Sequence, residues 1–107
     1  MAKGLDMNKL LQQAQQMQAQ MAQVQEELAN ETIEASAGGG MVTVKATGAG
    51  ELDGITIDAK AIDPDDPELL ADMILAAANE ALRSAQALAQ SKMNAATGLG
   101  GLGLPGL

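Results

Sequence analysis

The chain has 107 residues, a formal net charge of −8, and no cysteine, histidine or aromatic residue. These absences exclude disulfides, thiol chemistry, zinc sites of the Cys/His type and histidine as a general base. A core without aromatic residues has to consist of small aliphatic side chains, each of which buries little area. We therefore expect an obligate homodimer, in which a second copy supplies the missing burial.

The first predicted element is a helix from about residue 6 to about residue 30, with Asp6 as its N-cap. Apolar residues recur along it at alternating steps of three and four, which is the spacing of a coiled-coil seam, and glutamines fill most of the remaining positions. The seam consists of Met7, Leu10, Ala14, Met17, Met21, Val24 and Leu28. Another helix, in the same chain or in a second copy, has to cover it.

Residues 31–59 change to a period of two and predict a three-stranded antiparallel meander with one apolar face. Its turns are expected at the glycines of residues 38–40 and 48–50. In the third strand Leu52 is out of phase with Ile55, which indicates a bulge at Asp53-Gly54.

A second helix is predicted over residues 67–96, with Asp66 as N-cap and Pro67 at the first helical position. At 1.5 Å per residue it would be about 45 Å long, too long for so small a sheet to cover. Its distal half should pack on the first helix or on another subunit. Residues 97–107 are rich in Gly and Leu and are expected to form a flexible tail. The predicted fold is α+β, a single domain over residues 1–96.

The sequence predicts no active site, no metal site and no cofactor. The aspartates of residues 63–66 lack the mid-loop glycine of a calcium loop and are interpreted as a helix cap. The glycine clusters lack the lysine and helix of a phosphate loop. Ser91 and Lys92 are neighbours, and adjacent residues on a helix point in different directions, so a Ser–Lys pair is not supported. The chain is expected to be non-enzymatic.

Its location is expected to be cytoplasmic, with no membrane partner, because no signal peptide is recognisable and no apolar run approaches the roughly 18 residues that span a bilayer. Charge is unevenly distributed: residues 26–72 carry −10, whereas residues 1–25 and 73–107 carry +1 each. The cations of the two predicted helical arms are the candidates for contacts with DNA phosphates. They are Lys3, Lys9, Arg83 and Lys92. The lack of aromatic residues argues against recognition of single strands by base stacking.

Several stretches, in this order and at these spacings, form a recognisable pattern. They are LLQQAQQMQAQM (10–21), QEEL (25–28), AGGGMVTV (37–44), ITID (55–58), DMILAAANEA (72–81), KM (92–93) and LPG (104–106). The pattern covers almost the whole chain and resembles the YbaB/EbfC family of bacterial nucleoid-associated proteins.

The resemblance implies a tweezer-like homodimer with centrally paired sheets and projecting helical arms. It also implies binding of double-stranded DNA, a change in DNA conformation, and a role in nucleoid organisation and gene regulation. The family's DNA contacts are attributed to the arms, and the resemblance extends that role to the four arm cations.

An alternative function stays open: an acidic, coiled-coil-like dimeric adaptor that binds another protein rather than DNA. The acidic centre and the modest charge of the arms favour it. The position of the arm cations separates the two functions. Cations gathered on one face favour DNA, and acids interspersed among them favour the adaptor.

Overall fold

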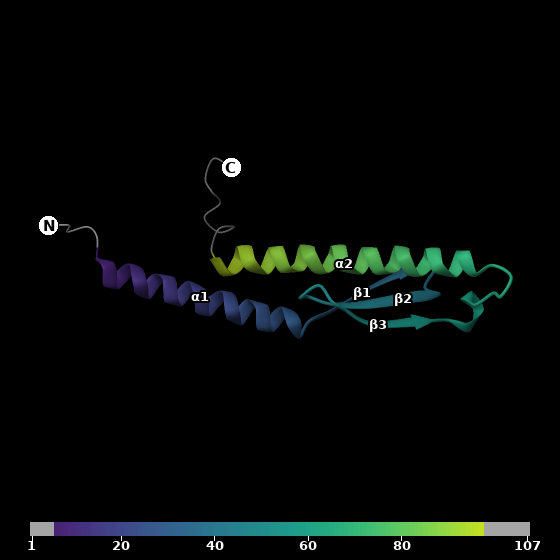
Figure 1. Cartoon of the computed structure of the whole chain (residues 1–107), viewed down its shortest axis with the longest axis horizontal. Helices are drawn as coiled ribbons and strands as arrows, with labels where there is room; N and C mark the ends of the chain where they lie inside the picture. Colours follow the sequence, from purple (N-terminus) through teal and green to yellow (C-terminus); the bar gives the residue numbers. More distant parts are fainter. Residues whose placement is uncertain (1–5, 98–107) are drawn as a thin grey trace, which may run out of the picture.

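The computed structural model describes residues 6–97 as a helix, three strands and a second long helix, which confirms the predicted order (Figure 1). The elements are α1 (Met7–Ala29), β1 (Thr32–Ala37), β2 (Val42–Thr47), β3 (Leu52–Ile57), the short 3-10 helix η1 (Ala59–Ala61) and α2 (Pro67–Thr97). The molecule is elongated, with extents of 78 × 30 × 16 Å. A flexible tail was expected over residues 97–107. Thr97 instead belongs to α2, and residues 98–107 lie outside the described range.

The strands form an antiparallel sheet in the order β1-β2-β3. Val42, Val44 and Ala46 of the central strand are fully buried. Because side chains alternate across a strand, these three point to one face, and the residues between them, such as the exposed Lys45, point to the other. The sheet therefore has one covered and one open face.

Three alanines of α2 complete the core. Ala77, Ala81 and Ala85 have no exposed surface and pack against the buried residues of β2. Their spacing of four places them along one side of the helix, and their small side chains let the helix backbone lie close to the sheet. The core is correspondingly thin, as expected for a chain without aromatic residues.

Helix α2 packs on β1 and β2 and leaves β3 largely uncovered (Figure 1). β3 contains the predicted bulge: Lys45 pairs with Gly54 and Ala46 with Leu52, so that Asp53 is the extra residue of the strand. Leu52 and Ile55 remain 46% and 48% exposed. One apolar part of the sheet thus has no cover within residues 6–97.

The end of β3 differs from the prediction, which continued the strand to residue 59. The strand ends at Ile57, because the Asp58 carboxylate accepts a hydrogen bond from the Lys60 backbone N–H at 2.9 Å and caps η1. Similar capping begins the helices: Asp6 accepts from the backbone of Asn8 at 3.0 Å, and Asp66 from that of Leu69 at 3.2 Å.

Candidate nucleic-acid interface

Helix α1 is anchored at one end only. Val24 and Leu28 are buried, and Met21 is half-buried, where α1 passes beside the distal half of α2. Towards its N-terminus α1 extends beyond the end of α2 (Figure 1). In the N-terminal half of α1, Met7 and Met17 are 65% and 53% exposed. Within one chain the predicted seam is therefore covered only at its C-terminal end, and the rest of α1 is a projecting arm.

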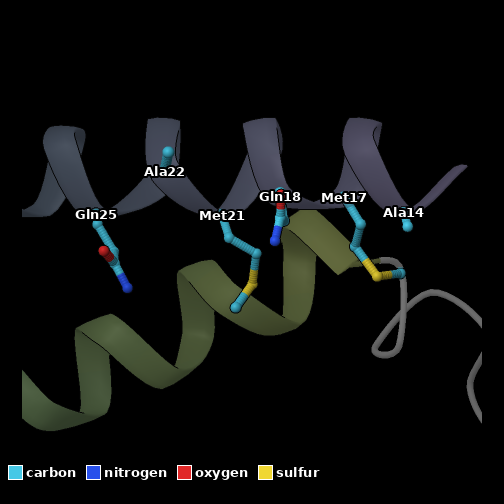
Figure 2. A pocket seen from close by; sticks show the side chains of 6 residues that line it. All are labelled: Ala14, Met17, Gln18, Met21, Ala22 and Gln25. Carbon is cyan, nitrogen blue, oxygen red and sulfur yellow. The ribbon is translucent and has the colours of Figure 1, made fainter. Parts of the chain in front are cut away.

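A hollow of about 610 Å³ lies along the middle of α1. Figure 2 shows Met21 and Gln25 pointing from α1 towards the last turns of α2. The lining residues are Ala14, Met17, Gln18, Met21, Ala22 and Gln25. These side chains neither titrate in the physiological range nor act as nucleophiles, so the hollow is a surface for packing and not for chemistry.

Lys92 joins the two helices. Its Nζ lies 3.5 Å from Glu27 Oε1 and 3.4 Å from Glu31 Oε2, and its side chain is 31% exposed. The last turn of α1 contains Glu27 and no basic residue, although the C-terminus of a helix carries partial negative charge. Lys92 supplies from α2 the positive charge that this helix end lacks. It is therefore a structural contact as well as a candidate DNA ligand.

Arg83 is also paired, within its own helix. Its Nη2 lies 2.9 Å from Glu80 Oε1, and both side chains are more than half exposed. Nine residues, or about two and a half helical turns, separate Arg83 from Lys92, which places the two on opposite sides of α2. One straight backbone of DNA phosphates therefore cannot contact both in a single copy.

Lys9 lies in the exposed first turn of α1. Among residues 6–97 no carboxylate comes within 4 Å of its ammonium group. Lys3 lies outside the described residues. The structure thus does not bring the described arm cations together, and it places acids beside Arg83 and Lys92.

The acidic partners of Arg83 and Lys92 were not predicted from the sequence. Glu27 and Glu31 are four residues apart, so they fall on the same side of the chain as it leaves α1. This spacing could have indicated that Glu27 and Glu31 form one acidic pair. It could not identify Lys92 as their partner, since Lys92 is about sixty residues away in the sequence.

Negative charge gathers at the opposite end of the molecule. The acidic linker between η1 and α2, from Asp63 to Asp66, lies at the far end from the free end of α1 (Figure 1). A polyanion approaching the arm would thus stay remote from this linker. Within residues 6–97 no group of acidic side chains is suited to hold a metal ion, and neither α1 nor α2 combines the length and hydropathy of a membrane-spanning segment.

Comparisons with known proteins agree with the resemblance. Residues 2–101 match the model of the YbaB/EbfC DNA-binding family. A nucleoid-associated protein of Saccharopolyspora erythraea is 49% identical over 109 residues, covering 95% of this chain and 94% of that protein. One of Streptomyces avermitilis is 53% identical over 103 residues, covering 95% and 91%. A crystal structure of an uncharacterized protein from Helicobacter pylori, 24% identical, has the same fold, with a TM-score of 0.73 over 89% of this chain and 97% of that one.

Proposed function

The chain belongs to the YbaB/EbfC DNA-binding family, and from this premise we propose that it binds double-stranded DNA through its helical arms, without sequence preference and without catalysis. The observation that carries the proposal is the family match, which spans every helix and strand of the fold. Two features of the structure support it. The arm projects from the body, and the acidic linker lies at the other end.

The binding unit of this proposal is a homodimer. Support comes from β3, an edge strand whose Leu52 and Ile55 are about half exposed, and from Leu75 of α2, which is 60% exposed. An uncovered apolar edge strand is a natural site for pairing with another chain. A second copy seated there would also double the number of arms and arm cations.

Two arms on one duplex provide a physical route to a change in DNA conformation. Phosphate contacts from both arms, separated by the body of the dimer, would favour DNA bent or twisted to reach them. Because phosphates carry no sequence information, such binding would act at many sites. This activity would locate the protein in the nucleoid and contribute to nucleoid organisation and gene regulation.

A second candidate function is a dimeric adaptor for another protein. The observation that favours it is the pairing of Arg83 with Glu80 and of Lys92 with Glu27 and Glu31, which places acids among the arm cations. The hollow at Met17 and Met21 would then receive the partner.

Fluorescence anisotropy of a labelled duplex, titrated with protein at about 50 and about 200 mM salt, tests the proposal. If only Lys3 and Lys9 of each copy neutralise phosphates, four contacts predict a slope of log K against log salt of about −3.6, a loss of roughly 150-fold over this range. If one of the paired cations, Arg83 or Lys92, also takes part in each copy, six contacts predict a slope of about −5.4.

The control separates arm contacts from overall charge. Lys3→Gln/Lys9→Gln removes two cations of the arm, and Lys45→Gln/Lys60→Gln removes two lysines of the sheet and η1, with the same change in net charge. The first pair should weaken binding much more than the second. Equal weakening would contradict the arm as the binding surface, and no binding at 50 mM would overturn DNA binding and favour the adaptor.

A further inference from the structure

The ion pairs of Lys92 lead to an inference about what limits DNA affinity, and this inference rests on the proposed function. We propose that Glu27 competes with DNA for Lys92: its carboxylate occupies the position that a phosphate oxygen takes when DNA binds, while Glu31 keeps the lysine anchored.

Distances and exposure support an exchange. The two separations, 3.5 and 3.4 Å, exceed the roughly 2.7–2.9 Å of a charge-assisted hydrogen bond, so the ammonium group is held loosely. The Lys92 side chain is 31% exposed and that of Glu27 is 50% exposed. A phosphate can therefore reach the lysine from solvent, and Glu27 can turn away into water at little cost.

The two carboxylates are not equivalent. Glu31 Oε2 is buried and accepts no hydrogen bond within the described residues, and Lys92 is the cation beside it. Removing Lys92 entirely would leave this buried oxygen without a counter-charge, which is unfavourable. Binding of DNA should thus replace the exposed Glu27 and retain the pair with Glu31.

The local charge shows why the competition matters. Two carboxylates around one ammonium group present a net charge of −1 to an approaching duplex, where Lys92 alone would present +1. Wild-type Lys92 therefore contributes less to affinity than a free lysine. Loss of Glu27 should raise the local net charge from −1 to zero and leave one side of the ammonium group available to a phosphate, while Glu31 stays paired.

Glu26 offers a matched control. It is exposed, it precedes Glu27 directly, and it lies more than 4 Å from the Lys92 ammonium group. Glu26→Gln and Glu27→Gln change the net charge equally at almost the same place on α1. Any difference in DNA binding between them reports the release of Lys92 rather than general attraction.

The test is the same anisotropy titration, with a double-mutant cycle. Glu27→Gln should bind about fivefold more tightly than Glu26→Gln at 50 mM salt, the scale of an exposed ion pair acting in both copies. Its salt slope should be steeper by about 0.9 for each additional phosphate contact. In the Lys92→Gln background the two glutamate variants should bind equally, and circular dichroism establishes that all are folded.

The outcomes separate the inference from the proposed function. If wild type binds DNA and the two glutamate variants bind equally, the competition is refuted and DNA binding stands. If Glu27→Gln keeps its advantage in the Lys92→Gln background, the effect does not act through Lys92, and the inference is refuted again. If neither wild type nor any variant binds at 50 mM salt, the proposed function fails, and the inference fails with it.

Discussion

The junction between α1 and the β2–β3 turn leads to a sharp prediction for Gly48→Ala. A Cβ added at Gly48 would lie 2.7 Å from the carbonyl oxygen of Leu28, 2.9 Å from its Cδ2 and 3.1 Å from its Cα. Two of these atoms belong to the backbone and cannot rotate away. The turn therefore has to move away from the end of α1, which strains the hydrogen bond that the Gly48 N–H donates to the Glu31 carbonyl at 3.1 Å.

The expected cost follows from three contributions. Overpacking of this kind destabilises by about 1–3 kcal/mol. Weakening the hydrogen bond adds up to about 1 kcal/mol. Restricting the unfolded chain by replacing Gly with Ala offsets roughly 0.4–1 kcal/mol. The net loss is about 2 kcal/mol, and in a domain of this size it should lower Tm by roughly 8–12 °C.

Thermal unfolding followed by circular dichroism measures this loss, and Gly54→Ala is the control. A Cβ at Gly54 would meet Lys45 Cδ at 4.0 Å, an ordinary contact, so its stability should stay within about 0.5 kcal/mol of wild type. All proteins are compared at one concentration, since Tm depends on concentration if the protein is a dimer. A Gly48→Ala variant as stable as Gly54→Ala would refute the close approach of Leu28 to the turn.

Two further predictions concern β3 and the ion pairs. Ile55→Glu should weaken self-association by about tenfold or more in sedimentation equilibrium, because it places a charge on the uncovered apolar face of β3. Ile62→Glu makes the same change at a residue that is 57% exposed outside the strands, and equal behaviour of the two variants would argue against β3 as the interface. Lys92→Gln should lower the free energy of unfolding by about 1 kcal/mol, since the partly buried Glu31 loses its counter-charge. Arg83→Gln breaks an exposed ion pair and should change the free energy of unfolding by less than about 0.5 kcal/mol. Urea titrations measure both variants, and a larger loss for Arg83→Gln than for Lys92→Gln would contradict the structural role of Lys92.

Local signals account for the elements of the fold. The steps of three and four in α1 and the capping of α2 by Asp66 depend on residues within one or two helical turns, so the sequence alone specifies them. The bulge at Asp53 is equally local, because one extra residue reverses the alternation of a strand. The end of β3 was missed, although its signal is also local: Asp58 is a capping residue that the apolar alternation concealed.

The arrangement of the arms and their charges required the tertiary structure. Periodicity predicts that the seam on α1 has to be covered, but the angle between α1 and α2 decides that Leu28 is buried while Met7 is exposed. The same angle brings Lys92 beside Glu27 and Glu31. A local sequence pattern covers only neighbouring residues, so it could not predict this pairing. Composition and spacing thus determined which elements form, because these depend on near neighbours along the chain. Arg83 pairs with Glu80 in the same helix, but only packing brings Lys92 to its two carboxylates, because the interaction between charges depends on their distance in space.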